Sequence, residues 1–198
     1  MNKKNTLTKE DVNELLQNPT VEQKKNVLEK LSSQYNNQTL SDNQRIIAEQ
    51  IFRNLMQETE IEVRKALSEN IMNNNQVPKD VVLSLAQDVE EVSCPILEFS
   101  EVLSDSDLIE IISNTESVSK QMSIANRSTV STDVSGALIE KGEDSVVDGL
   151  LKNVGAEIED DDYSTIIENF ASNNKIVESI ITKGALSPSL IEKLTTTI

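Results

Sequence analysis

The residues of this sequence best suited to chemistry are carboxylates, and four of them stand in one run, Glu159 to Asp162. Such oxygens could ligate a hard cation, but calcium needs about six to eight oxygen ligands in an ordered spacing. The alternating acids and central glycine of an EF-hand loop are missing here. Acidic residues also favour the first turn of a helix, and the sequence predicts that a helix begins here, before Tyr163. We therefore predict a helix start rather than a metal site.

The sequence has many serines and one cysteine but no histidine to activate them. Cys94 is the single cysteine, so neither a cysteine–histidine pair nor a serine–histidine–aspartate triad can form. A serine–lysine dyad remains possible, although nothing in the sequence marks one particular pair. We predict that Cys94 is a small buried thiol and that Pro95 lies near the first turn of its helix, where the missing N–H costs little. The sequence thus predicts a protein that is not an enzyme and has no cofactor.

The longest stretch of one charge lies between Lys79 and Lys120, where the chain has ten acidic residues and no basic one. These acids are Asp80, Asp88, Glu90, Glu91, Glu98, Glu101, Asp105, Asp107, Glu110 and Glu116. They either attract a basic partner through their summed field or form a solvated outer face that keeps the protein soluble. The predicted partner is a protein with a basic, Lys/Arg-rich segment. Four of the acids are the candidate partner-binding residues: Glu90, Glu91, Asp105 and Asp107.

Charge and composition argue against several other partners. The 198 residues include 34 Asp and Glu against 18 Lys and Arg, which gives a formal net charge of −16. Phosphate backbones and anionic bilayers repel a polyanion of this strength. Aromatic residues, at 3%, leave little surface for base stacking. We predict neither a nucleic-acid partner nor a membrane partner.

The sequence favours a cytoplasmic location. Residues 1–8 (MNKKNTLT) lack the apolar segment of a secretory signal, and no run approaches the roughly 18–20 apolar residues of a membrane span. A single cysteine excludes a disulfide framework within the chain. A protein exported without a signal would show the same features.

Apolar residues recur at steps of three and four, which predicts helices throughout and almost no strand. Five glycines and four prolines leave few breaks in this pattern. Three N-terminal helices are predicted to begin at capping residues: Thr8, Thr20 with Gln23 three residues later, and Ser41 with Gln44 three residues later. The five aromatic residues fall on apolar helix faces and are predicted to be buried: Tyr35, Phe52, Phe99, Tyr163 and Phe170.

From about residue 61 the apolar pattern repeats every 26 to 30 residues. A first set of apolar anchors consists of Val63, Val92, Val118, Val146 and Ile176. A second set consists of Val77, Leu103, Val130, Ile158 and Leu186. The two sets of anchors have nearly the same period, which predicts pairs of short helices. Each pair is expected to bury its apolar face against the next pair.

Several segments resemble a known family. Residues 62–69 (EVRKALSE), with Val77-Pro78 and residues 85–88 (LAQD), resemble a HEAT-type repeat. Residues 91–114 (EVSCPILEFSEVLSDSDLIEIISN) and 124–134 (IANRSTVSTDV) resemble the bacterial "domain of unknown function 2336" family. The resemblance runs from about residue 46 to the C-terminus. It implies a HEAT-like helical solenoid of alphaproteobacterial proteins, without an established activity or catalytic residues. Arg64 has no basic counterpart after the later anchors, so an arginine–aspartate ladder through all repeats is not implied.

These observations predict an all-α protein, a right-handed solenoid of short HEAT-like helix pairs with a period of about 28 residues. Residues 1–58 are predicted to be N-terminal helices packed on the first repeat, and residues 59–198 five helix-pair repeats in one continuous solenoid. The predicted function is a non-catalytic protein–protein interaction scaffold or adaptor. The alternative is a regulatory or sensor module that acts on a signalling enzyme.

The last predicted helix carries apolar residues, namely Leu190, Ile191 and Leu194, yet no polar capping repeat follows it. Terminal repeats normally present a polar outer face. The sequence therefore predicts either a truncated chain or a homodimer that forms through the C-terminal repeat.

Overall fold

The computed structural model describes residues 15, 17, 19–184 and 186–197, and in these residues it contains twelve helices and no strand. The all-α class predicted from the apolar periodicity is therefore confirmed. The helix predicted to begin at Thr8 lies outside the described residues. The helices group into two compact units, Met1–Leu103 and Ser104–Ile198. The predicted boundary between residues 58 and 59 lies inside the first unit, and it stays a prediction.

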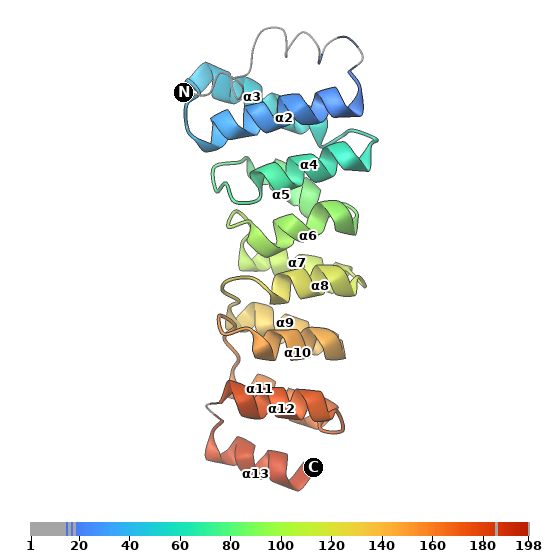
Figure 1. Cartoon of the computed structure of the whole chain (residues 1–198). Helices are drawn as coiled ribbons and strands as arrows, with labels where there is room; N and C mark the ends of the chain where they lie inside the picture. The colour runs from blue at the N-terminus through green and yellow to red at the C-terminus, as the bar shows by residue number, and fades with distance from the viewer. Residues whose placement is uncertain (1–14, 16, 18, 185, 198) are drawn as a thin grey trace. The chain divides into compact units, whose positions relative to one another are not determined.

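In the first unit, α2, α4 and α6 pack in succession, with α4 in contact with both of the others (Figure 1). Helix α3 contacts α2 and α4, and α5 contacts α4 and α6. The helices of this unit are α2 (Val21–Asn36), α3 (Asp42–Leu55), α4 (Ile61–Ile71), α5 (Lys79–Ala86) and α6 (Glu90–Phe99).

The predicted starts of α2 and α3 are confirmed as capping boxes. Thr20 Oγ1 accepts a hydrogen bond from the Gln23 backbone N–H at 3.3 Å, and Gln23 Oε1 accepts one from the Thr20 N–H at 2.8 Å. Ser41 and Gln44 form the same motif at the start of α3. Each box satisfies N–H groups that the first turn of a helix would leave without partners.

Four of the five aromatic residues are buried as predicted, and Phe99 is not. Tyr35 and Phe52 meet edge to face, with ring centroids 5.3 Å apart, in the core of the first unit. Phe99 is 46% exposed. It is the last residue of α6, and the buried face of that helix runs through Ile96 and Leu97 to Ser100 instead.

Two further expectations for α6 need correction. Pro95 lies in the middle of the helix rather than near its first turn, because α6 begins at Glu90. Its ring nitrogen therefore cannot donate to the Glu91 carbonyl, as an ordinary residue at this position would. Cys94 is half-buried rather than buried.

Adjacent helix pairs of the first unit are joined by an arginine–aspartate pair. Arg64, in the first turn of α4, donates from Nε and Nη2 to the two carboxylate oxygens of Asp88, with the Nη2 contact at 2.8 Å. Its Nη1 donates to the Glu58 and Thr59 carbonyls at 2.6 and 3.2 Å. Both side chains of the pair are about 15% exposed (14% and 15%). Arg64 therefore joins the turn before α4 to the turn before α6.

In the second unit, two rows of helices pack against each other (Figure 1). One row consists of α8, α10 and α12, and the other of α7, α9, α11 and α13, with each helix in contact with the next in its row. The helices are α7 (Asp105–Asn114), α8 (Val118–Ala125), α9 (Thr132–Lys141), α10 (Asp144–Lys152), α11 (Asp160–Phe170), α12 (Asn174–Lys183) and α13 (Pro188–Thr197).

The two sets of sequence anchors occupy equivalent places in this arrangement. In the second unit the first set lies on α8, α10 and α12, and the second set lies just before α9, α11 and α13. Val146 and Ile176 of the first set are fully buried, whereas Val118 is 38% exposed. The packing of the helices is consistent with a helical repeat.

The turns before α9 and α11 are joined through their backbones. Val130 N–H donates to the Gly155 carbonyl at 3.0 Å, and Glu157 N–H donates to the Val130 carbonyl at 2.9 Å. The Asn153 amide donates to the Ala125 and Arg127 carbonyls at 2.7 and 2.8 Å, and its oxygen accepts from Gly155 N–H at 2.8 Å. A Cβ on Gly155 would lie 2.0 Å from the Ser128 carbonyl oxygen, so the close approach of the two turns requires glycine here.

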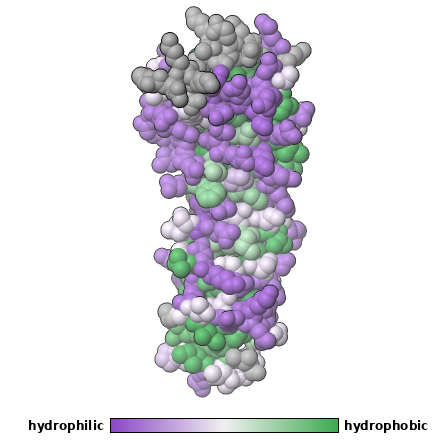
Figure 2. Space-filling view, viewed as in Figure 1, coloured by the Kyte–Doolittle hydropathy of each residue, from purple (hydrophilic) through white to green (hydrophobic). Residues whose placement is uncertain are grey.

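The last helix packs differently from the prediction. Leu190 and Leu194 are buried, at 3% and 5% exposure, and α13 packs on α11. Ile191 is 50% exposed, and a hydrophobic patch lies over the α12 and α13 part of the visible face (Figure 2). The homodimer stays a prediction, and Ile191 rather than either leucine is the side chain on α13 that would test it.

Candidate functional site

The four predicted partner-binding residues lie at helix starts in both units. Glu90 and Glu91 are exposed in the first turn of α6, in the first unit. Asp105 and Asp107 lie in the first turn of α7, in the second unit. Asp107 also has a local role, because its carboxylate accepts hydrogen bonds from Ser104 N–H at 2.8 Å and from Ser104 Oγ at 2.6 Å. These acids therefore stabilise helix starts whether or not a partner binds them.

The structure brings a different set of acids together between α9 and α11, in a shallow hollow of about 390 Å³ that also borders α7. We call this hollow the acidic groove. Four carboxylates and no basic side chain line it: Asp133, Glu140, Glu159 and Asp162. Its remaining lining residues are small or uncharged: Ile109, Thr132, Gly136 and Ala137.

Two helix starts and one glycine position these carboxylates. Ser131 caps α9, which places Asp133 in the first turn, and Glu159 is the residue before α11, which places Asp162 in the first turn of that helix. Contact between α9 and α11 brings the two starts to the same groove. A Cβ on Gly136 would lie 3.3 Å from Asp162 Oδ1, so glycine gives this carboxylate room against α9.

Asp162 is half-buried, whereas the other three groove carboxylates are exposed. Burial raises the pKa of Asp162, and the charges of Glu159 and Asp161 raise it further, while a hydrogen bond from the Glu159 backbone opposes them. The ionised form is therefore less favoured than in an ordinary aspartate. A cation placed in the groove would relieve this cost, because opposite charge favours the ionised carboxylate.

The groove acids are not gathered around one point. In the part of the chain that the structure describes, no group of three or more His, Cys, Asp or Glu side chains is placed to hold a metal ion. The carboxylates are instead spread along two helices. An extended chain with several positive side chains matches this distribution better than a single ion does.

Sequence reasoning found only part of this groove. The Glu159–Asp162 run was correctly interpreted as a helix start, since α11 begins at Asp160. Asp133 and Glu140 were not singled out, and neither was the second role of Asp162. The sequence does contain one sign of the groove: Asp133 and Asp162 lie about one repeat apart, with Gly136 between them.

A second cluster, between α10 and α12, could suggest nucleophilic chemistry. Ser179 Oγ donates to Asp148 Oδ1 at 2.6 Å, and Lys152 Nζ donates to Asp148 Oδ2 at 2.6 Å. Burial would raise the pKa of Asp148, but the hydrogen bonds from Lys152 and Ser179 outweigh it and lower the pKa. A carboxylate with a lowered pKa is a weak base, and Ser179 donates to it rather than to a lysine. The arrangement suits a structural link between the two helices better than an activated serine.

The comparison with protein families agrees with the resemblance noted in the sequence. The family described as "Uncharacterised protein conserved in bacteria (DUF2336)" matches residues 92–198, and the chain belongs to this family. The match includes α7 to α13 and therefore both clusters described above. No curated protein matches the sequence. None of the helices in the described residues is long and apolar enough to cross a bilayer.

Proposed function

We propose that the protein is a non-catalytic protein–protein interaction scaffold or adaptor, and that its acidic groove binds a Lys/Arg-rich segment of a partner protein. The observation that carries this proposal is the groove itself. Four carboxylates from two helices line one hollow, with no basic side chain among its lining residues. In the second unit as a whole, residues 104–198 include 17 acidic and seven basic residues, so the surrounding field also attracts cations.

The predicted architecture supports this proposal. We propose that the helix pairs form HEAT-like repeats of a right-handed solenoid, a construction that offers extended surfaces for partners. The contacts within each row of helices and the recurrence of the anchors favour this interpretation. A continuous solenoid over residues 59–198 stays a prediction, and so do the cytoplasmic location and the alternative regulatory or sensor role.

Two of the predicted partner-binding residues and the observed groove make one testable surface in the second unit. Asp105 and Asp107 lie at the start of α7, which packs on α9, and Ile109 of α7 lines the groove. A basic segment in the groove would therefore pass near the start of α7. Charges at the edge of an interface mainly raise the association rate, by about 10 to 10³-fold at low salt.

The test measures how a labelled nine-residue peptide of alternating arginine and leucine binds the full chain, by fluorescence anisotropy. The triple variant Asp133→Asn, Glu140→Gln and Asp162→Asn removes three groove charges. We expect it to weaken binding by about tenfold or more, which corresponds to about 1.4 kcal/mol, and to reduce the salt dependence. Crosslinking mass spectrometry of native complexes would then identify the natural partner.

The matched control carries the same change of charge at three exposed sites of the same unit outside the groove: Glu143→Gln, Glu157→Gln and Glu192→Gln. We expect this control to bind nearly as well as the unaltered chain. Equal weakening by the two triple variants would show that only the overall charge matters and would contradict the proposal. Circular dichroism of both variants checks that the helices are retained.

A further inference from the structure

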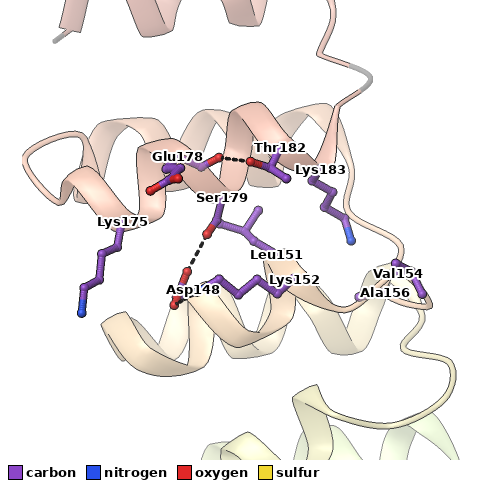
Figure 3. A pocket seen from close by; sticks show the side chains of 10 residues that line it. All are labelled: Asp148, Leu151, Lys152, Val154, Ala156, Lys175, Glu178, Ser179, Thr182 and Lys183. Atoms are coloured by element: carbon purple, nitrogen blue, oxygen red, sulfur yellow. Dashed lines mark hydrogen bonds and ion pairs between the residues drawn. The ribbon is translucent and has the colours of Figure 1, made fainter.

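A cleft with three lysines lies between α10 and α12, in the other row of helices of the second unit (Figure 3). It has a volume of about 800 Å³, roughly twice that of the acidic groove. We call it the lysine cleft, after Lys152, Lys175 and Lys183. Only two acids, Asp148 and Glu178, also line it. In a unit with an excess of ten acidic residues over basic ones, this local excess of positive charge stands out.

The lysines are spread along the cleft rather than gathered at one point. Lys175 and Lys183 lie at opposite ends of α12, with Lys152 on the facing helix between them (Figure 3). Eight residues of helix separate the two α12 lysines, which is a rise of about 12 Å. An extended peptide covers this distance in about four residues.

Each lysine retains capacity for another partner. The Lys183 ammonium donates to the Asn153 carbonyl at 2.6 Å, and an ammonium has three donors. Burial lowers the pKa of Lys183, so its positive charge is incompletely solvated. Lys175 is exposed, and Lys152, with its side chain 63% exposed, is bound to Asp148 at one edge.

Apolar surface lies beside the charges. Leu151 and Ala156 are buried in the wall of the cleft, and Val154 at its edge is fully exposed. A ligand that places an apolar group beside Val154 and carboxylates beside the lysines would therefore find complementary surface along the whole cleft. No aromatic residue lines the cleft, so it offers no platform on which a base could stack.

We propose that the lysine cleft binds an acidic protein segment in extended form, with two carboxylate side chains about four residues apart and an apolar residue just beyond the carboxylate that meets Lys183. The three lysines provide the charge complementarity, and Val154 provides the apolar contact. A nucleic-acid strand fits less well, because its continuous phosphates would meet the net negative charge of the unit on either side of the cleft. This proposal does not depend on the acidic groove, which belongs to the other row of helices.

The experiment uses the full chain and a labelled nine-residue peptide with glutamates four positions apart and a leucine on the outer side of one of them. A second peptide has glutamine in place of each glutamate. Fluorescence anisotropy at low salt is expected to show binding of the glutamate peptide at least tenfold tighter than that of the glutamine peptide. The double variant Lys175→Gln and Lys183→Gln is expected to weaken binding of the glutamate peptide by about tenfold.

The matched control is Lys141→Gln with Lys193→Gln, which makes the same change of charge in the same unit outside the cleft. It is expected to bind the glutamate peptide as the unaltered chain does. The single variant Lys175→Gln, at an exposed position, is expected to weaken binding without affecting folding, which covers the case in which Lys183→Gln perturbs the turn at Asn153.

Three results would overturn the proposal. The first is equal binding of the glutamate and glutamine peptides. The second is equal weakening by the cleft and control variants. The third is tighter binding of a single-stranded oligonucleotide, lost in the same lysine variants, which would make the cleft a nucleic-acid site.

Discussion

The two units join neighbouring helix pairs by different chemistry. In the first unit, Arg64 forms a bidentate ion pair with Asp88 and binds two backbone carbonyls. In the second, the Asn153 amide and a backbone pairing of Val130 with the turn at Gly155 link the turns before α9 and α11. One link depends on a charged side chain, and the other on the shape of the backbone.

The difference shows that similar helix packing does not require the same polar contact in each unit. A planar guanidinium reaches several acceptors at once and tolerates some variation in the turns around it. A backbone pairing requires the two turns to approach closely, which leaves no room for a side chain at Gly155. The link in the second unit should therefore be the more sensitive to a small change of shape, and the link in the first unit to a change of charge.

The largest expected effect is that of Gly155→Ala. The added methyl group would meet the Ser128 carbonyl oxygen at 2.0 Å, a backbone atom that cannot move independently. We expect a loss of about 3 kcal/mol or more in the free energy of unfolding, measured by urea denaturation. Hydrogen exchange should rise in peptides from residues 104–198. Gly136→Ala is the control, because its methyl would meet only the Asp162 side chain, and a near-zero effect is expected.

Arg64→Ala should have the next largest effect. It removes a mostly buried ion pair. The Asp88 carboxylate then loses the guanidinium but keeps the hydrogen bond from the Val89 N–H, and two carbonyls lose the Arg64 donor, at a cost of about 2 kcal/mol. Arg64→Lys should recover only part of this stability, since an ammonium cannot form the bidentate contact. Lys65→Ala, which removes an exposed contact with Glu69, is the control. A result in which Arg64→Ala costs no more than Lys65→Ala would refute the structural role of the pair.

Asn153→Ala should cost slightly less, about 1–2 kcal/mol, because neutral hydrogen bonds contribute less than those to charged groups. Its cost should not change between low and high salt, whereas that of Arg64→Ala should decrease as salt rises. Asn126→Ala, at an exposed asparagine in the same unit, is the control. Equal salt dependence of the Arg64 and Asn153 variants would contradict the distinction between the two links.

The smallest effect is expected for Arg53→Gln, which removes the exposed ion pair between Arg53 and Asp80 in the first unit. The hydrogen bond from Arg53 lowers the pKa of Asp80, although burial opposes it. The pair therefore stabilises the fold above the ordinary aspartate pKa, and this contribution is lost as the pH falls through the lowered value. Urea denaturation at neutral and acidic pH should detect little change, because solvent screens exposed pairs. A cost comparable with that of Arg64→Ala would show that solvent exposure does not determine how much each of the two ion pairs contributes to stability.

Periodicity was sufficient to predict the helical class and most of the helix starts. Thr20 and Ser41 each precede a helix as expected, and Ser104 and Ser131 do the same before α7 and α9, because short polar side chains satisfy the first N–H groups. Phe99 and Pro95 were misplaced because the exact start and end of α6 decide which residues face the core. A shift of one or two residues at a helix boundary cannot be derived from apolar spacing alone.

The surfaces were harder to predict than the helices. The acidic stretch from Asp80 to Glu116 drew attention because its residues are consecutive in the sequence. The acidic groove combines Asp133 and Asp162, and the lysine cleft combines Lys152 and Lys183, about one repeat apart in the chain. Such sets become visible only when neighbouring repeats are placed side by side. The Gly155 contact is a backbone feature and has no charge or apolar pattern to reveal it.

The partial burial of Lys183 has a consequence for its reactivity. Because burial lowers its pKa, a larger fraction of this side chain is the free amine at a given pH than for a lysine with an ordinary pKa. The free amine is the form that attacks acylating reagents. Acylation of Lys183, followed by mass spectrometry, should therefore proceed readily at mildly alkaline pH. A ligand that covers this amine and keeps it protonated should slow the reaction, so the rate of acylation at one residue reports occupancy of the space around it.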